Sequence, residues 1–442
     1  MNILLVGNGA REHAIEKTLS KSPQDKKLYA FMSAKNPGIT RLAAGYQLGD
    51  TCKPDDIAAY ALKNKIELAV VGPEAPLAAG IVDALEQEGI ACASPGKVAA
   101  QLETDKTFCR NLLEKYRIPG NPRHGVFADY KKACEYIDSL KEDFVVKPAG
   151  LTGGKGVKVI GEHLKSKDEA KAYVREILSA KVGHIPKAVI EEKLVGEEFT
   201  LQAFVDGKHV VGMPMVQDHK RAYEGDRGAN TGGMGSYSDS GLILPFLTKK
   251  DYSQGLDIMK ATVAAVQKET GTPYKGFLYG QFMATSVGVG VIEFNARLGD
   301  PEAMNVLSVL ESDLVDICTR MANGSLKQDI AFGRKATVCK YMVPEGYPEN
   351  PKKNVELTVD EKGIERVGGS VYYASVREEN GKIISSASRS VAVVGIADSI
   401  SNAEKVAEES IHYIKGELFH RKDIGTAELI QKRINHMRAL RD

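Results

Sequence analysis

Two polar side chains near residue 293 have the spacing and chemistry of metal ligands. Glu293 and Asn295 stand in an apolar run that is typical of a strand, and residues two apart in a strand point to the same face. Their oxygens suit Mg²⁺ or Mn²⁺ that also holds substrate phosphates. Gln281 falls almost opposite Glu293 if the chain turns between them, so it could join or orient these ligands. Arg297 and Asp300 follow the strand. The group predicts a phosphoryl-transfer site, with ordinary polar residues on an exposed strand as the alternative.

A glycine-rich loop between two predicted strands carries two lysines. Residues 147–156 hold Lys147 and Lys155 around four glycines. Glycine follows Lys155 where a P-loop has Ser or Thr, and a strand follows where a P-loop has a helix. A hairpin lid of this kind could close over a triphosphate, with the lysines balancing its charge in a site that excludes water. A flexible exposed hairpin with solvated lysines is the alternative.

The linker after this loop has backbone and carboxylate groups suited to a nucleoside. Its backbone could bond an adenine edge, and the carboxylate of Glu198 could accept hydrogen bonds from ribose hydroxyls. Glu-rich linkers are common on protein surfaces, so this pattern is weak by itself. The predicted hinge residues are Glu191, Glu192, Lys193 and Leu194.

The N-terminal turn has the form of an anion site. Asn8, Gly9 and Arg11 follow a predicted strand and open a helix, where backbone N–H groups attract phosphate. Arg11 would add charge-assisted bonds to such an anion. The dinucleotide fingerprint needs a glycine where Glu12 stands. An NAD site is therefore disfavoured, and the alternatives are a phosphate-binding turn and a plain tight turn.

A charged segment followed by a long glycine-rich stretch indicates an active-site loop. Asp218, Lys220 and Arg221 precede the stretch at residues 225–241, which includes Asn230. We expect this stretch to be too long and too rich in glycine for a packed element, so it is either disordered or functional. The density of charged residues beside it favours function.

The first 103 residues predict a Rossmann-like domain that would position the N-terminal turn. Short apolar runs alternate with helical patterns there, which indicates a parallel doubly wound sheet. Pro54 follows Asp50 and Thr51, which is the pattern of a helix N-cap with proline in the first turn. Pro95 after Ser94 repeats this pattern. The predicted strands are residues 3–6, 28–32, 68–71 and 90–93.

The rest of the chain divides into a central domain, residues 104–325, and a smaller C-terminal α+β domain, residues 326–442. Within the central domain, residues 125–192 form a compact α+β unit that we interpret as a lid. We expect helices at residues 101–116, 301–324 and 402–418, hairpins at 198–216 and 277–295, and strands at 337–343, 370–376 and 390–394.

Composition limits the class of function. The chain has 442 residues, and Lys plus Arg at 59 against Asp plus Glu at 58 leaves a formal charge of +1. This length has room for about three domains, and this charge balance disfavours binding to nucleic acid or to an anionic membrane. Six scattered cysteines without a C-x-x-C pair disfavour a disulfide scaffold or structural zinc. The apolar runs are too short to span a membrane, and we expect a cytoplasmic protein.

Taken together, the motifs resemble the phosphoribosylamine–glycine ligase family of ATP-grasp enzymes, also called glycinamide ribonucleotide synthetases. The resemblance covers essentially the whole chain, and the segments at residues 217–221 and 230–235 carry it most specifically. It implies a Rossmann-like N-terminal domain, an ATP-grasp body with a lid, and a C-terminal domain. The other matching segments are residues 7–13, 71–77, 293–302 and 421–425.

The resemblance also implies a role for each matching residue. The residues implied at the nucleotide are Lys106, Lys147, Lys155, Glu191, Glu192, Lys193, Leu194, Glu198 and Asn230. Those implied at the metal are Glu293, Asn295 and Gln281. Those implied at glycine or 5-phosphoribosylamine are Asn8, Gly9, Arg11, Glu12, Pro73, Glu74, Asp218, Lys220, Arg221, Arg297 and Asp300. Those implied in catalysis are Lys147, Lys155, Asp218 and Arg297.

The implied reaction joins glycine to 5-phosphoribosylamine, using ATP with Mg²⁺ or Mn²⁺ and passing through glycyl phosphate. Its product, glycinamide ribonucleotide, belongs to de novo purine biosynthesis. We expect small-molecule substrates without nucleic acid or membrane partners, and a monomer or weak homodimer. The alternatives are another ATP-grasp ligase or carboxylase, a dinucleotide-dependent oxidoreductase, and a non-catalytic nucleotide-binding regulator.

Overall fold

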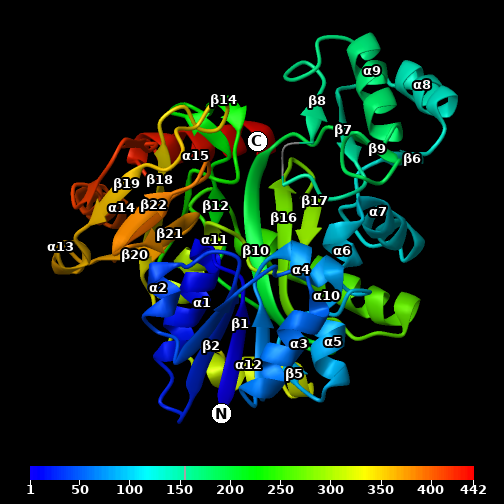
Figure 1. Ribbon diagram of the computed structural model, residues 1–442. Coiled ribbons are helices and arrows are strands. Elements are labelled where there is room, and N and C mark those ends of the chain that lie inside the picture. The colour runs from blue at the N-terminus through cyan, green and yellow to red at the C-terminus, as the bar shows by residue number, and fades with distance from the viewer. Residues whose placement is uncertain (154–155) are drawn as a thin grey trace.

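The computed structural model describes residues 1–153 and 156–442, so the predicted lid residue Lys155 lies outside the described residues. Figure 1 shows the N-terminal domain in blue, the lid in cyan at the upper right, and the C-terminal segments in orange and red on the opposite side. The green strands of the body lie between these three parts.

The N-terminal domain is a parallel sheet flanked by helices, as its apolar runs predict. Its elements are β1 (Asn2–Val6), α1 (Ala10–Ser20), β2 (Lys27–Met32), α2 (Pro37–Thr40), β3 (Gly45–Leu48), α3 (Pro54–Lys63), β4 (Leu68–Val71), α4 (Glu74–Ala79), α5 (Ile81–Gln87) and β5 (Ala91–Cys92). The order β3-β2-β1-β4-β5 changes direction at β1 and β4. Ligands of such sheets bind beyond the carboxyl ends of the strands at this switch point. Gly7 and Gly72 follow these two strands, so the fold brings both predicted substrate segments together.

The two proline signatures of this domain differ from their prediction. Pro54 does begin α3, but the N-cap is Lys53, which makes no side-chain cap bond. Residues 50–51 therefore do not cap this helix. No helix begins at Pro95. The hydroxyl of Ser94 instead accepts a backbone N–H bond of 2.9 Å from β4, so this serine ties two strand ends together.

The body is an antiparallel sheet of order β11-β10-β16-β17. Its elements are α6 (Gln101–Thr104), α7 (Lys106–Lys115), β10 (Glu197–Asp206), β11 (Val210–Gly212), α10 (Lys249–Thr270), β16 (Lys275–Ala284), β17 (Val289–Asn295), α11 (Glu302–Ser308) and α12 (Leu314–Asn323). Gln281 lies opposite Glu293 across β16 and β17, which confirms the pairing inferred from the turn between them.

The lid has its own sheet, of order β6-β9-β7-β8. Its elements are β6 (His124–Phe127), α8 (Tyr130–Ser139), β7 (Phe144–Pro148), β8 (Lys158–Val159), α9 (Lys167–Leu178) and β9 (Ala188–Glu192). Both helices bury apolar side chains in a core that is separate from the rest of the molecule, around residues such as Ile137, Phe144 and Val174.

The three long predicted helices are each shorter than expected. The helix at 101–116 is divided into α6 and α7 because Asp105 leaves the helical conformation, and its carboxylate caps α7. The region at 301–324 is likewise α11 and α12, with Asp313 as the N-cap of α12. The last predicted helix, at 402–418, ends at Ile411, and two short strands follow it. In each case a polar residue that can cap a helix, or a strand pairing, interrupts the helical pattern.

The C-terminal domain shares a sheet with the central part of the chain, since the order β12-β15-β18-β23-β20 joins strands from both sides of the predicted boundary at 325/326. The stretch at residues 225–241 contains β14 and β15, and β15 is fully buried beside β18. The prediction that this stretch is too glycine-rich to pack is therefore wrong. The elements are β12 (Gln217–Asp218), β13 (Arg221–Tyr223), β14 (Arg227–Asn230), β15 (Gly235–Ser238), β18 (Ala336–Pro344), β19 (Glu356–Val359), α13 (Glu361–Arg366), β20 (Gly369–Tyr373), β21 (Val376–Glu379), β22 (Lys382–Ser385), β23 (Val391–Ala397), α14 (Ile400–Ile411), β24 (Ile414–Lys415), β25 (Leu418–Phe419) and α15 (Ala427–Arg441).

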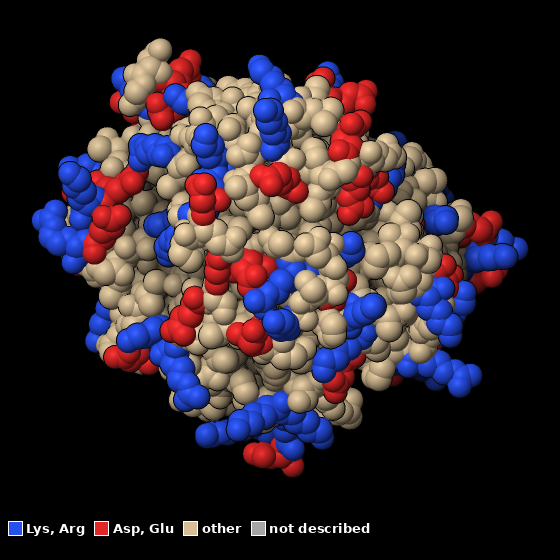
Figure 2. All heavy atoms as spheres, turned by 90° about the horizontal axis from the view of Figure 1, so that it is seen from below, with Lys and Arg blue, Asp and Glu red and all other residues tan. Residues whose placement is uncertain are grey.

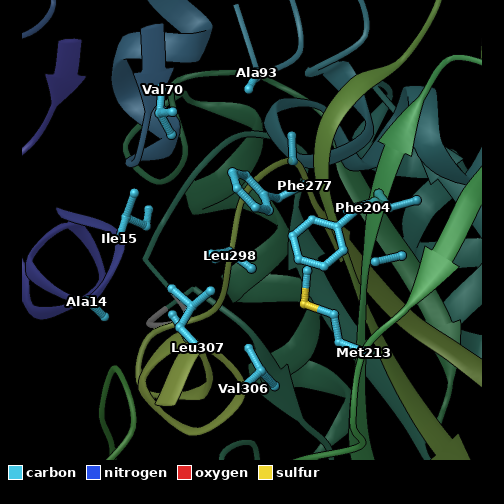
Figure 3. Close-up of a cluster of buried hydrophobic side chains, with 14 of the residues drawn as sticks. Ala14, Ile15, Val70, Ala93, Phe204, Met213, Phe277, Leu298, Val306 and Leu307 are labelled. Atoms are coloured by element: carbon cyan, nitrogen blue, oxygen red, sulfur yellow. The ribbon is translucent and has the colours of Figure 1, made fainter. Parts of the chain in front are cut away.

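One hydrophobic core joins the N-terminal domain to the body. Figure 3 shows Ile15 of α1 and Val70 of β4 on one side of this core, and Phe277, Leu298 and Leu307 of the body next to them. Burial of each large apolar side chain stabilises the fold by roughly 1.5–3 kcal/mol. The turn after β1 is therefore fixed against the body.

The surface mixes both signs of charge on the face seen from below. Figure 2 shows Lys and Arg interspersed with Asp and Glu over this face, in line with the formal charge of +1. A mixed face of this kind does not present the single-sign field that attracts a polyanion. Among the described helices, none combines the length and the apolar character needed to cross a membrane.

Candidate active site

All parts of the molecule contribute to one cavity of about 1090 Å³. A cavity of this size can hold a nucleotide together with small substrates. The predicted site residues that line it are Arg11, Glu74, Lys147, Glu191, Glu192, Lys193, Leu194, Glu198, Asp218, Lys220, Arg221, Asn230, Gln281, Glu293, Asn295, Arg297 and Asp300. Lys106 lines a smaller adjoining pocket that shares Lys147 and Glu293 with the cavity. Asn8, Gly9 and Glu12 of the N-terminal turn and Pro73 after β4 are not among the residues that line the cavity.

A buried ion triad of Arg110, Lys147 and Glu191 lies on the lid side of the cavity. Glu191 accepts two hydrogen bonds from Arg110, at 2.7 and 2.9 Å, and pairs with Lys147 at 2.7 Å. Burial and the nearby Arg110 lower the pKa of Lys147, and Glu191 counteracts them. These two cations hold the pKa of Glu191 at about 2 although burial alone would raise it. Lys147 also donates to the carbonyl of Ile292 at 3.1 Å, which holds the ammonium beside Glu293.

Arg110 was missed by the sequence reasoning. It lies on the buried face of α7, and its guanidinium also donates to the carbonyls of Val291 and Ile292. The sequence did carry one signal for Arg110, namely a charged residue on the inward face of an amphipathic helix. Such a residue needs a buried partner.

The predicted metal ligands meet at the end of β17. Burial would raise the pKa of Glu293, but Lys106, Lys220 and Lys147 together lower it below its usual value. This carboxylate is therefore ionised in a cationic setting, which suits a hard cation shared with phosphates. The oxygen of Asn295 accepts a bond of 3.3 Å from Arg297 and keeps a second lone pair for a ligand. The residues present thus fit Mg²⁺ or Mn²⁺.

Gln281 is engaged mainly with Glu198. Its amide donates to the Glu198 carboxylate at 2.8 Å, and Lys220 pairs with the same carboxylate at 3.0 Å. The oxygen of Gln281 accepts a long bond of 3.4 Å from Tyr279. This geometry makes Gln281 a group that orients Glu198, and its part in metal binding stays a prediction.

Arg297 connects the body to the N-terminal domain. Its guanidinium pairs with Glu103 at 2.8 Å and with Glu74 at 3.5 Å. Arg297 and Arg11 hold the pKa of Glu74 below its usual value despite burial. Burial raises the pKa of Glu103 to about 7, against the effect of Arg297. Glu103 was missed by the sequence reasoning because it stands in a helix that has no recognisable motif.

The N-terminal turn already holds a carboxylate of the chain. Glu12 accepts the backbone N–H of Gly9 and the Nε–H of Arg11, both at 2.6 Å. A Cβ on Gly72 would lie 2.2 Å from the Glu12 side chain, so this packing requires glycine there. Glu12 therefore takes up the Gly9 amide, and phosphate binding at this turn stays a prediction. The side-chain oxygen of Asn8 accepts a hydrogen bond of 2.7 Å from the hydroxyl of Ser33.

The residues of the charged segment at 218–221 have different surroundings. Burial raises the pKa of Asp218 to about 7, opposed by Lys220 and supported by the nearby carboxylates of the cavity. Arg221 pairs with Glu162 of the lid at 2.9 Å and donates to the carbonyl of Gly228. Arg221 thus contacts the lid, and its predicted contact with substrate stays a prediction. The His219 side chain is buried, and neither ring nitrogen has a hydrogen-bond partner among the described residues.

An arginine of the C-terminal domain, Arg389, holds the glycine-rich loop in place and was also missed. It donates to the carbonyls of Gly232 and Asp300 at 2.7 and 2.8 Å. It also pairs with the Asp300 carboxylate at 3.3 Å and stacks over the ring of Tyr341. The contact reaches 157 positions along the chain, so no local pattern indicated it.

Comparison with known proteins agrees with this arrangement along the chain. Three family models match, described as the N domain of phosphoribosylglycinamide synthetase at residues 1–103, its ATP-grasp (A) domain at 104–303 and its C domain at 337–427. The chain belongs to the phosphoribosylglycinamide synthetase family. The phosphoribosylamine–glycine ligase of Methanopyrus kandleri is 52% identical over 100% of this chain and 99% of its own length.

Solved structures agree with this assignment of family. The phosphoribosylamine–glycine ligase of Thermotoga maritima has a TM-score of 0.81 at 27% identity, over 96% of this chain and 100% of that one. The biotin carboxylase domain of Hydrogenobacter thermophilus 2-oxoglutarate carboxylase, in complex with MgADP and bicarbonate, has a TM-score of 0.71 at 16% identity, over 99% of this chain and 93% of that one. The second likeness shows the shared fold alone. Rossmann-like, ATP-grasp and C-terminal parts are thus confirmed for this chain.

Proposed function

We infer that this chain is the ATP-dependent ligase that joins glycine to 5-phosphoribosylamine, giving glycinamide ribonucleotide, ADP and phosphate in purine biosynthesis. The observation that carries this inference is the meeting of two sets of groups in one cavity. The lysines and carboxylates suited to ATP border it from the lid and body, and Glu74 and Arg11 border it from the N-terminal domain. Membership of the family supports the same reaction.

In the first step the glycine carboxylate would attack the γ-phosphate of ATP in line, forming glycyl phosphate and ADP. Such transfers depend on positioning and on charge stabilisation. Lys147 would contact the nucleotide phosphates, and its bonds to Ile292 and Glu191 support this role by holding its ammonium next to Glu293. Mg²⁺ or Mn²⁺, when held by Glu293 and Asn295, supplies positive charge to the phosphate oxygens.

In the second step the amine of phosphoribosylamine would displace phosphate from glycyl phosphate. Arg297 would act between the two substrates, and its pairing with Glu74 of the N-terminal domain supports this role. Asp218 in its ionised form would hold the ammonium group of glycine. Because an acyl phosphate is easily hydrolysed, closure of the lid over the cavity protects the intermediate from water.

A coupled assay of ADP formation tests this function. We expect sustained turnover only when ATP, glycine and phosphoribosylamine are all present, with glycinamide ribonucleotide formed in equal amount. Bicarbonate in place of glycine distinguishes a carboxylating ATP-grasp enzyme, and tight ATP binding without any turnover distinguishes a regulator. Either of those results would contradict the ligase assignment. Glu293→Ala is the matched inactive control.

A further inference from the structure

Helix α15 returns from the C-terminal domain to the body and places three side chains at the cavity. Lys432, Arg433 and His436 line it, and Figure 1 shows α15 in red beside β14 above the body. The C-domain family model ends at residue 427, and the sequence motifs did not include this helix. Its contribution to the cavity thus comes from the structure alone.

Arg433 bridges two carboxylates that belong to different walls of the cavity. One is Glu197 at the start of β10, 3.3 Å from the guanidinium. The other is Asp226 at the turn between β13 and β14, which also accepts a hydrogen bond from Arg433. The exposed fractions of the Arg433 and Glu197 side chains are 17% and 6%. At such burial a charge pair is poorly screened. Asp226 also pairs with Arg421 at 3.1 Å and Glu197 with His436 at 2.6 Å, but Arg433 is the group that joins the two carboxylates.

The two carboxylates lie next to groups of the predicted site. Glu197 begins β10 after the predicted hinge at residues 191–194 and directly precedes Glu198, the predicted ribose acceptor. Asp226 has a positive φ of 57° in the turn of the β13–β14 hairpin, which carries Arg221. The Arg221 guanidinium contacts the lid through Glu162. A shift of either carboxylate would therefore move the ribose end of the site or the contact between hairpin and lid.

Building on the proposed ligase function, we propose that Arg433 is a positioning residue of the nucleotide site. By bridging Glu197 and Asp226, it fixes the hinge end of β10 and the β13–β14 hairpin relative to each other. It does not touch the reacting atoms. The planar guanidinium suits this role because its fork of N–H donors can serve two carboxylates at once, whereas a lysine ammonium is a single point of charge.

The same helix offers a matched control. Arg441 pairs with the buried Asp251 through two hydrogen bonds, at 2.7 and 3.0 Å, and Asp251 forms the capping box of α10 with the N-cap residue Thr248. This second pair also docks α15 on the body, but Arg441 is not among the residues that line the cavity. Loss of Arg441 therefore tests docking of the helix without removing the bridge at the nucleotide.

The test compares Arg433→Ala, Arg433→Lys and Arg441→Ala in the full chain. The KM values for ATP and glycine come from steady-state turnover, the Kd of MgADP from calorimetric titration, and the melting temperature from scanning calorimetry. We expect Arg433→Ala to raise the KM for ATP and the Kd of MgADP about tenfold, equivalent to about 1.4 kcal/mol, with the KM for glycine changed less than about twofold. Arg433→Lys should recover part of the loss.

Arg441→Ala should lower the melting temperature as much as Arg433→Ala while it leaves the KM for ATP unchanged. An equal rise in the KM for ATP in both alanine variants would overturn the proposal, and so would an unchanged Kd of MgADP in Arg433→Ala. If that variant does not fold, Arg433→Lys carries the same test. A wild-type chain that binds MgADP but does not ligate glycine would contradict the ligase function, and the Kd comparison would still decide the role of Arg433.

Discussion

Replacement of Glu191 by glutamine should destabilise the protein, because this carboxylate neutralises two buried cations. The side chains of Arg110, Lys147 and Glu191 are 3%, 6% and 4% exposed. Removal of one partner from a buried pair typically costs about 3–5 kcal/mol of the free energy of unfolding, since the other charge is left without compensation. Glutamine keeps the size of the side chain and one acceptor oxygen, so we expect the lower end, about 3 kcal/mol.

The neighbouring Glu192 provides the matched control. It pairs with Arg123, whose side chain is 70% exposed, and exposed pairs are worth about 1 kcal/mol or less. Urea unfolding at neutral pH should therefore separate Glu191→Gln, with a large drop in the midpoint, from Glu192→Gln, with a small one. Equal midpoints in the two variants would refute the argument that burial makes the triad strong.

The same substitution should also change how ATP binding depends on pH. Burial lowers the pKa of Lys147, and Glu191 counteracts this effect. Without the negative charge the pKa of Lys147 falls further, so the lysine loses its proton at a lower pH. The KM for ATP in Glu191→Gln should then begin to rise at a lower pH than in the wild type. Identical pH profiles would mean that Lys147 does not contact the phosphates.

Three other substitutions test separate parts of the site and fold. Glu293→Ala should abolish turnover and leave the melting temperature nearly unchanged; activity like that of the wild type would contradict the metal assignment. In the wild type, kcat/KM for glycine should rise with pH around 7, as Asp218, whose pKa burial raises to about 7, becomes ionised, and Asp218→Asn should flatten this profile. Glu16 has no hydrogen-bond partner among the described residues, and burial raises its pKa well above the usual range. The folded chain thus keeps a proton that the unfolded chain releases above about pH 4.3, so stability should fall with rising pH by up to about 1.4 kcal/mol per unit. Glu16→Gln should remove this slope, as urea midpoints at about pH 5 and pH 8 would show.

The parts of the fold that follow local rules were predictable from the sequence. Four buried apolar runs of the N-terminal domain became the strands β1, β2, β4 and β5, because strands buried on both faces are apolar throughout. The remaining strand, β3, is short and mostly exposed at the edge of the sheet, so it lacks that signal. The stretch at residues 225–241 was misjudged because β15 is buried by its pairing with β18, about a hundred residues further along the chain.

The candidate site likewise contains residues that the sequence indicates and residues that only the structure reveals. Glu293, Asn295 and Lys147 stand in segments whose types and spacing indicate their chemistry, and all three border one cavity. Arg110 and Arg389, which hold those segments in place, could not be identified from spacing. Their partners lie 81 and 157 positions away, and only the packing of distant elements brings them together.

Four cations of the cavity are each paired with a carboxylate of the chain, and this pairing explains why acidic residues are frequent in a site for a polyanion. A buried lysine without a partner would tend to lose its proton. A neighbouring carboxylate keeps it charged and fixes its direction before ATP arrives. The positive charge that binds the phosphates must then come from the cations in excess of these carboxylates, together with Mg²⁺. The paired carboxylates contribute to ATP binding by keeping the cations charged and in place. These pairs are Lys147 with Glu191, Lys220 with Glu198, Arg297 with Glu103, and Arg389 with Asp300.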